Sequence, residues 1–319
     1  MLVLVTGGAG FIGSNLVDAL LESGHTVRIL DNFSTGKQEF VRHLSSNPQC
    51  EIVSGDLLDD DLVASTVQGV DAVVHLAANA DVRFGWKHPR RDLEQNVIAT
   101  QNVLEAMRAA TVRRLVFSST GSVYGEATTI PTPEHAPYPD QTSLYGASKN
   151  AAEGIISAYA SAGFIDATVF RFVSILGPRY THGHVIDFVA QLVHDGSVLK
   201  VLGDGTQRKS YLHVRDCVSA ILLRLPQSPR FETLNLGVDS YCEVKDSVGW
   251  ITGRMGLQPR IEFSGGDRGW VGDNPFIYLD TTAMRALGWT PQSKIQKAVE
   301  DTVDWILANQ WILSAAVTN

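Results

Sequence analysis

The glycine-rich turn Thr-Gly-Gly-Ala-Gly-Phe-Ile-Gly at residues 6–13 constrains this chain more than any other feature. It follows the apolar run Leu2–Val5 and opens a helical pattern that continues to Ser23. Glycines let such a turn close tightly and let backbone N–H groups approach a phosphate, and the helix start adds unpaired donors. Asp31 closes the next apolar run, at the distance where an acid accepts the ribose hydroxyls of a dinucleotide. We therefore predict a dinucleotide site, with a purely structural tight turn as the alternative.

Composition narrows the class of protein and its partners. The 319 residues carry a net charge of −8 without a basic stripe, so we expect neither nucleic acid nor a membrane surface as a partner. Cys50, Cys217 and Cys242 lie far apart, which favours neither a disulfide framework nor a metal site. The chain begins directly with a strand pattern, and no apolar run reaches the length of a membrane span. A cytoplasmic protein is the expectation.

Short apolar runs alternate with helical patterns through the first half of the chain. This alternation predicts an α/β fold with a doubly wound parallel sheet of the Rossmann type, covered by helices on both faces. We assign residues 1–174 to the dinucleotide-binding domain and 175–319 mainly to a smaller substrate-binding lobe, with a strand near 233–238 returning to the sheet. The expected strands are Leu2–Val5, Thr26–Leu30, Glu51–Val53, Ala72–His75, Arg114–Phe117 and Ala167–Phe170, and the helices lie near 12–23, 37–46, 60–67, 90–110 and 143–162.

Tyr145 and Lys149 place a phenol and an ammonium four residues apart, on one face of a helix that Thr142 or Ser143 would cap. A nearby cation favours the phenolate, so we expect a lowered pKa for Tyr145 and a role in acid–base chemistry. The residues 118–120, Ser-Ser-Thr, end an apolar strand and bring hydroxyl groups to the same sheet edge. The alternatives are a surface helix pair and simple capping of the strand end.

Several motifs in this order resemble a known family. The chain is similar to extended short-chain dehydrogenases/reductases of the NAD-dependent epimerase/dehydratase type, and within them to UDP-glucose 4-epimerases. The resemblance covers nearly the whole chain. It rests on 6–13, Asp31-Asn32, 55–57, 75–78, Asn96, 118–120 with 123–125, 145–149, Arg171, Gly177-Pro178 and 287–291.

The resemblance implies NAD as the cofactor, because Asp31 would repel the 2′-phosphate of NADP. It implies catalytic roles for Thr120, Tyr145 and Lys149. It also implies that the cofactor-binding residues are Gly7, Gly10, Phe11, Ile12, Gly13, Asp31, Asn32, Ser34, Thr35, Gly36, Asp56, Leu57, Leu76, Ala77, Ala78, Asn96, Ser118, Tyr145, Lys149 and Phe172.

The residues after Ser119 help to choose the reaction. Related dehydratases and decarboxylases carry acids here, whereas this chain has Gly121 and Ser122, so the resemblance disfavours elimination and favours inversion at C4 of a UDP-hexose through a 4-keto intermediate. The alternatives are another nucleotide-sugar epimerase, such as one acting on UDP-glucuronate, a reductase, and an NAD-binding regulator without turnover.

The substrate residues depart from the family pattern. Ser174 replaces an asparagine and Lys209 an arginine, while Arg268 and Asp273 are spaced differently from usual. At the position that gates the sugar pocket, Ile277 leaves more room than tyrosine, so the resemblance implies that N-acetylated UDP-sugars are accepted. The substrate set is therefore Thr120, Tyr145, Ser174, Lys209, Arg268, Asp273 and Ile277.

Two further expectations concern surfaces and histidines. Helices 90–110 and 143–162 carry apolar positions that we read as outward-facing, and in the family such helices pair into the four-helix bundle of a homodimer. Their own core contacts are the alternative. We interpret His75 and His213 as structural, and the segment 181–184 as a mobile loop beside the substrate. The outward-facing positions are Val97, Val103, Met107, Ala151, Ile155 and Tyr159.

Overall fold

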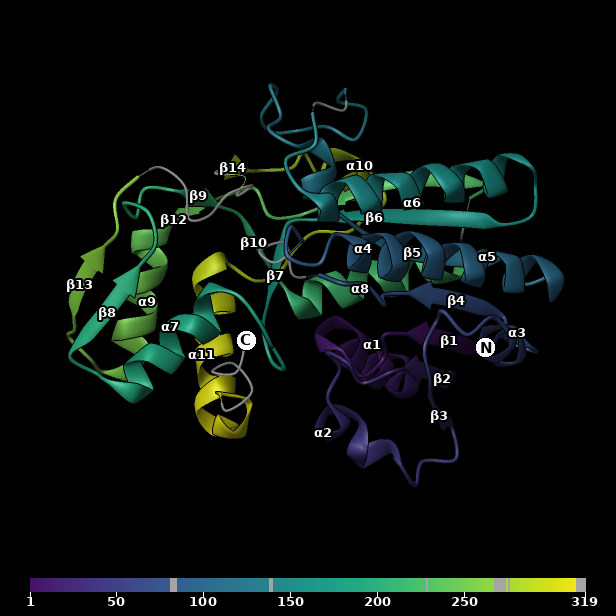
Figure 1. The fold of residues 1–319 in the computed structure, drawn as a ribbon, viewed down its shortest axis with the longest axis horizontal. Coiled ribbons are helices and arrows are strands. Elements are labelled where there is room, and N and C mark those ends of the chain that lie inside the picture. Colours follow the sequence, from purple (N-terminus) through teal and green to yellow (C-terminus); the bar gives the residue numbers. More distant parts are fainter. Residues whose placement is uncertain (81–84, 138–139, 228, 267–273, 275, 314–319) are drawn as a thin grey trace.

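The computed structural model describes residues 1–80, 85–137, 140–227, 229–266, 274 and 276–313. Its centre is a seven-stranded parallel sheet in the order β11-β6-β5-β4-β1-β2-β3 (Figure 1). After β3 the chain crosses to the other side of β1, which confirms the doubly wound sheet. The strands are β1 (Leu2–Thr6), β2 (Thr26–Asp31), β3 (Cys50–Ser54), β4 (Ala72–His75), β5 (Arg114–Thr120), β6 (Asp166–Phe172) and β11 (Phe231–Leu236).

Helices cover both faces of the sheet. They are α1 (Phe11–Glu22), α2 (Gln38–Val41), α3 (Asp60–Val67), α4 (Pro89–Asp92), α5 (Ala99–Ala109), α6 (Leu144–Ser161) and α8 (Val214–Arg224). Alternate residues of a strand point to opposite faces. Val3 and Val5 of β1 therefore join the core that contains Leu16 of α1, whereas Leu4 joins a second core with Met107 of α5. Both faces of β1 are buried, which explains its unbroken apolar sequence.

Three elements differ most from the sequence predictions. The helix expected at 37–46 is a single α-helical turn, α2, followed by the 3-10 turn η1 (Arg42–Leu44). The helix expected at 90–110 is divided into α4, the π-helical segment η3 (Leu93–Ile98) and α5. Strand β5 continues beyond its apolar run to Thr120, because Ser118, Ser119 and Thr120 still pair with β6. The hydroxyl groups therefore belong to the strand itself.

Most of the remaining elements form the smaller lobe, seen at the left of Figure 1. Strand β11 lies at the edge of the main sheet beside β6, as predicted, and α8 packs against α1, so both belong spatially to the first half of the chain. The lobe contains β7 (Ser174–Leu176), α7 (His184–His194), β8 (Val198–Val201), β9 (Arg208–Lys209), β10 (Tyr211–His213), β12 (Cys242–Glu243), α9 (Val244–Met255), β13 (Arg260–Phe263), β14 (Phe276–Ile277), α11 (Ile295–Ala308) and η6 (Gln310–Ile312). The short elements η5 (Leu225–Gln227) and α10 (Thr282–Ala286) contact β5 and β11 of the main sheet.

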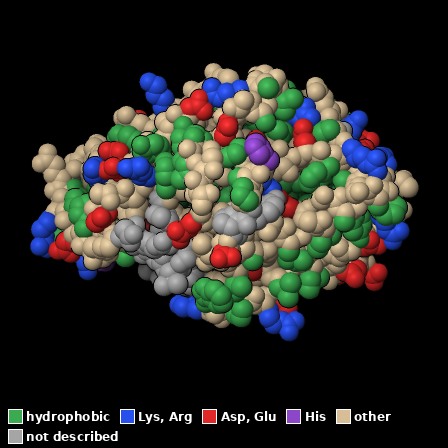
Figure 2. Space-filling model, turned by 90° about the horizontal axis from the view of Figure 1, so that it is seen from above, with side chains coloured by type: hydrophobic (Ala, Val, Ile, Leu, Met, Phe, Trp, Pro, Cys, Tyr) green, Lys and Arg blue, Asp and Glu red, His purple; other side chains and the backbone are tan. Residues whose placement is uncertain are grey.

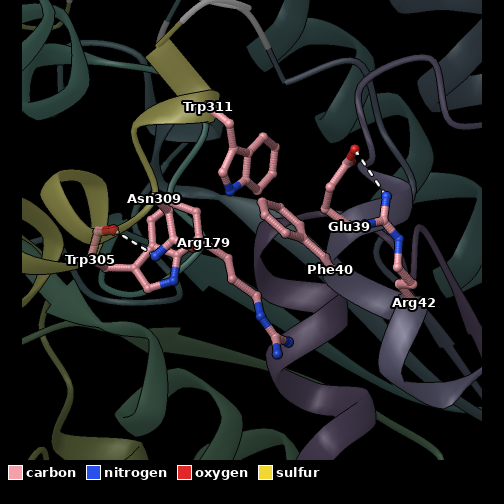
Figure 3. A pocket seen from close by; sticks show the side chains of 7 residues that line it. All are labelled: Glu39, Phe40, Arg42, Arg179, Trp305, Asn309 and Trp311. Carbon is pink, nitrogen blue, oxygen red and sulfur yellow. Dashed lines mark hydrogen bonds and ion pairs between the residues drawn. The ribbon is translucent and has the colours of Figure 1, made fainter.

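An aromatic contact joins the end of the described chain to the dinucleotide half (Figure 3). The buried ring of Phe40 on α2 lies edge-on to Trp305 of α11 and to Trp311 of η6, with centroid distances of 5.8 and 5.9 Å. Ile312 and Leu313 are buried in the same core. The apolar residues at 311–313, for which the sequence suggested no role, thus fasten α11 to α2.

Candidate active site

Eleven of the twenty predicted cofactor residues come together in a cleft at the carboxyl ends of the central strands, beside the point where the strand order reverses. This is where doubly wound sheets bind their ligands. Leu30, Gly55 and Gln95 complete the lining, and our predictions did not include them. The predicted residues that line the cleft are Gly7, Gly10, Asp31, Asn32, Ser34, Thr35, Gly36, Leu57, Leu76, Ala77 and Ala78.

The glycine turn is shaped by close backbone contacts. Gly7 has a φ of +69°, and a Cβ there would lie 2.7 Å from the Ala77 backbone nitrogen. A Cβ on Gly13 would lie 2.1 Å from the Gly7 carbonyl oxygen. Helix α1 begins at Phe11, and its N-cap Gly10 has no side chain that could bond the first N–H groups of the helix. The turn therefore offers donors and space to a diphosphate.

Asp31 forms the other end of the cleft. Its carboxylate accepts hydrogen bonds from the backbone N–H groups of Ala9, at 2.9 Å, and Phe33, at 2.8 Å. Burial raises the pKa of this carboxyl, and the two N–H bonds oppose the effect. The Asn32 amide donates to Asp56 at 2.8 Å, so two of the predicted cofactor residues hold each other. A fixed carboxylate beside the open cleft suits a ribose diol and disfavours a phosphate.

Tyr145 and Thr120 meet at the reactive end of the site. Ser143 caps α6 by accepting a bond from the Gly146 N–H at 3.0 Å, as predicted. Burial raises the pKa of Tyr145 to about 12. A hydrogen bond with Thr120 lowers this pKa, whereas the charge of Asp92 raises it further. The expectation of a lowered tyrosine pKa is therefore wrong for the protein without its cofactor.

The position of Lys149 explains this difference. Its Nζ lies 4.0 Å from the centroid of the Phe117 ring, and the side chain is 1% exposed. Burial lowers the pKa of Lys149 to about 7, with the charge of Glu153 opposing the shift. An ammonium that is only partly ionised at neutral pH, and that faces a ring of β5, gives little support to the phenolate of Tyr145.

Other predicted residues support the cleft from behind. Asn96 is buried, accepts a bond from the Asn79 N–H at 2.8 Å and donates to Ser148 at 2.9 Å. Ser118 donates to the His75 carbonyl at 3.2 Å. Phe172 pairs with Thr120 across the two strands, so it lies at the reactive edge. Gln95 precedes Asn96 in the π-helical segment, and such segments are frequent at functional sites.

The histidines have structural partners. His75 bonds Thr6 at 2.6 Å and Thr100 at 3.0 Å, and burial lowers its pKa to about 3, which confirms the structural interpretation. His213 caps α8 by accepting from the Arg215 N–H. His184 begins α7 and bonds Ser247 at 2.8 Å, so it does not belong to a loop. Within the described ranges, three or more potential metal ligands do not gather at any point.

On the substrate side, Ile277 lies beside the reactive end. A Cβ on Gly121 would lie 2.8 Å from Cγ2 of Ile277, so β14 touches the turn that follows Thr120. The Lys209 ammonium donates to the Asn274 carbonyl at 2.7 Å. Ser174 is exposed on β7. Arg268 and Asp273 lie outside the described residues.

Comparison with known proteins identifies the family. A sequence model of the NAD dependent epimerase/dehydratase family matches residues 3–237, from β1 to the end of β11. The chain belongs to this family. It is 32% identical over 314 residues to a putative UDP-glucose 4-epimerase of Methanocaldococcus jannaschii, covering 97% of this chain and 99% of that protein.

Solved structures of named epimerases share the fold of this chain. A UDP-galactose 4-epimerase structure is 39% identical with a TM-score of 0.87, covering 98% of this chain and 100% of the other. A UDP-glucuronic acid 4-epimerase mutant from Bacillus cereus, solved in complex with UDP-4-deoxy-4-fluoro-glucuronic acid and NAD, is 26% identical with a TM-score of 0.89, covering 97% of this chain and 100% of the other. This family member is an NAD-dependent enzyme, and the cleft lined by Asp31 fits that cofactor.

The described surface carries charges of both signs. On the face shown in Figure 2, Lys and Arg side chains are interspersed with Asp and Glu. Among the described residues, no helix is both long and apolar enough to cross a bilayer. The hollow at Phe40, Trp305 and Trp311 shares no lining residue with the cofactor cleft.

Proposed function

We propose that this enzyme inverts C4 of a UDP-hexose, interconverting UDP-glucose and UDP-galactose. The observation that carries the proposal is the hydrogen-bonded pair of Thr120 and Tyr145 at the carboxyl edge of the sheet, followed by Gly121 and Ser122. The pair can move a proton at a sugar hydroxyl, and the two following residues supply no carboxyl group for elimination. The named UDP-glucose and UDP-galactose 4-epimerases support the same reaction.

Each residue of the site has its own role in the proposed reaction. NAD, when bound, supplies reversible hydride acceptance. Tyr145, as phenolate, takes the proton of the C4 hydroxyl, and Thr120 shares the hydrogen bond. Lys149 holds the nicotinamide ribose, while Phe11 and Ile12 donate backbone N–H groups to the diphosphate. The resulting 4-keto sugar would turn about its diphosphate linkage, so that C4 would take the hydride back on its opposite face while Tyr145 returns the proton to the C4 oxygen.

A panel of sugars tests the proposal. The NAD-loaded enzyme is incubated separately with UDP-glucose, UDP-galactose, their N-acetyl forms and UDP-glucuronate, and products and NADH absorbance are followed. We expect interconversion of the hexose pair without accumulation of NADH. Turnover of UDP-glucuronate alone would favour the alternative that the Bacillus cereus structure represents. Accumulating NADH would indicate a reductase, and an absence of any product would indicate an NAD-binding regulator.

Ile277 is proposed to set the room for the sugar. Its contact with Gly121 places it beside the reactive pair, where a larger ring would narrow the pocket. In Ile277→Tyr we expect turnover of UDP-GlcNAc to fall at least about tenfold relative to UDP-glucose, since discrimination of even one methylene group in a pocket is worth about 1–3 kcal/mol and the N-acetyl group is larger. The ratio of kcat/KM values for the two sugars is the measurement. A ratio equal to that of the wild type would remove Ile277 from the pocket.

We also propose a homodimer formed through α5 and α6. Two of the six predicted outward positions are wrong, because Val103 and Met107 are buried in the protein's own core. Of the other four, Ala151 is exposed and Val97, Ile155 and Tyr159 are partly exposed. The segment η3, which precedes α5, adds Leu93 and Ile98, 48% and 41% exposed. Light scattering should give twice the mass of 34.7 kDa, and a double substitution of Leu93 and Ile98 by serine should give the monomer. A monomeric wild type would contradict the proposal.

A further inference from the structure

A buried ion pair lies below the reactive residues on helix α6. Glu153 follows Lys149 by one helical turn and Tyr145 by two, so the three side chains share one side of the helix. Arg171 of β6 donates to both oxygens of Glu153: Nε at 3.1 and 3.2 Å, and Nη2 at 2.6 Å. Glu153 is 4% and Arg171 2% exposed.

The Glu153 carboxylate also holds the end of strand β5. It accepts a hydrogen bond from the Ser119 hydroxyl, and Ser119 immediately precedes Thr120. Helix α6 carries Tyr145 and strand β5 carries Thr120, so this carboxylate joins the two elements whose side chains form the reactive pair.

Arg171 extends the connection to the turn and the segment around the sugar pocket. Its Nη1 donates to the Tyr124 hydroxyl at 2.7 Å and to the Glu134 carbonyl at 2.9 Å. Tyr124 in turn donates to Asn235 at 2.9 Å, and the Asn235 amide donates to the Thr132 carbonyl at 2.9 Å.

Asn235 also donates to the Asp280 carbonyl at 3.1 Å, three residues beyond Ile277. This hydrogen-bond network therefore begins at Glu153 on helix α6, passes Tyr124 in the turn after Thr120 and ends at Asp280, close to β14.

The chemistry of the Glu153–Arg171 ion pair indicates a role in positioning the elements that it joins. A buried ion pair is weak evidence for stability, because the cost of desolvating the two charges offsets their attraction. The two-pronged contact between an arginine and a carboxylate does, however, fix the distance between the elements that carry them. We propose that Glu153 and Arg171 are positioning residues that hold Thr120 against Tyr145 in the geometry needed for proton transfer. This inference rests on the proposed function of that pair. Neither residue reaches the cleft lining, so each acts through Ser119, Tyr124 and helix α6.

The test uses the NAD-loaded enzyme with both charges removed together, Glu153→Gln with Arg171→Gln, because removing one leaves a buried charge unpaired. Displacement of reacting groups by about an ångström costs about 100-fold in rate, so we expect kcat to fall to that extent while KM changes little. Arg171→Lys keeps the charge but loses the fork and is expected to show the same loss of kcat.

The matched control lies at the same two strands. Arg113, which directly precedes β5, and Asp166 of β6 form a two-pronged pair at the opposite end of these strands, with both N···O distances 3.0 Å and side chains 52% and 26% exposed. Arg113→Gln with Asp166→Asn removes an equivalent pair far from Thr120. We expect kcat to remain at the wild-type value.

A second readout follows Tyr145 without substrate. The phenol is titrated by ultraviolet difference absorbance in each NAD-loaded protein, with the corresponding Tyr145→Phe protein subtracted. Loss of the Thr120 hydrogen bond should move the pKa of Tyr145 upward in the Glu153/Arg171 double variant and leave the control unchanged. Among the described residues, Asp92 on α4 supplies the charge that acts on this phenol, and these variants leave it in place.

The outcomes separate the two proposals. A folded double variant with wild-type kcat and an unchanged Tyr145 titration would overturn the positioning role. A wild type that converts none of the sugars would overturn the proposed function, and the Tyr145 titration would then decide the positioning role alone.

Discussion

Tyr145→Phe should lower kcat for UDP-hexose interconversion by at least about 100-fold, the usual contribution of a positioned acid–base group. The substitution removes only the hydroxyl that is bonded to Thr120, and the helix that carries it keeps its Ser143 cap. We therefore expect the variant to fold and to bind NAD with nearly the affinity of the wild type. Turnover is measured with UDP-galactose, and NAD affinity by calorimetry.

The dependence on pH provides an independent part of this prediction. Burial holds the pKa of Tyr145 at about 12 before the cofactor binds, so the phenol is protonated at neutral pH. A base with a raised pKa becomes more ionised as the pH rises. The kcat of the wild type should consequently increase from pH 6 to alkaline pH as the phenolate fraction grows, and the residual activity of Tyr145→Phe should lack this increase.

Tyr159→Phe is the matched control, since it removes a tyrosine hydroxyl from the other end of the same helix. That hydroxyl accepts a bond from Gln101 at 2.6 Å and donates to Glu105, far from β5's carboxyl end. Its removal should leave kcat and its pH profile unchanged. Retention of near wild-type turnover by Tyr145→Phe itself would end the proposed acid–base role.

The local parts of the site could be predicted from the sequence because local geometry determines them. A strand, a glycine turn and a helix start place Gly7, Gly10 and Asp31 around one cleft almost regardless of the rest of the chain. The cap at Ser143 and the spacing of Tyr145 and Lys149 follow in the same way from helix geometry.

The parts that depend on distant segments could not be predicted. Helical spacing puts Lys149 on the right side of α6, but the ring of Phe117 on β5 decides where its ammonium lies and how much it affects Tyr145. Glu153 and Arg171 lie on different elements, and nothing local to either residue signals the pair. Apolar spacing likewise showed that Met107 lies on an apolar stripe without showing that the protein's own core covers it.

Gly13→Ala should weaken NAD binding by more than about tenfold, the second large effect that we expect. The added methyl group would lie 2.1 Å from the Gly7 carbonyl oxygen and 2.8 Å from the Gly8 Cα, and both are backbone atoms of the turn. Overpacking of this kind costs about 1–3 kcal/mol, and each 1.4 kcal/mol is a factor of ten in affinity. The helix must move away from the turn, which withdraws the N–H groups of Phe11 and Ile12 from the diphosphate.

Gly249→Ala on α9 is the control for the substitution itself, because a Cβ there meets no atom within 4 Å. Alanine is the better helix former, so this variant should be slightly more stable and bind NAD as the wild type does. Calorimetric titration with NAD and thermal unfolding are measured for both. Since the cleft around Asp31 remains intact in Gly13→Ala, the loss should appear as affinity rather than as a failure to fold. Equal NAD affinity in Gly13→Ala and the wild type would show that the helix start does not hold the diphosphate, and the cofactor would then depend mainly on the Asp31 end of the cleft.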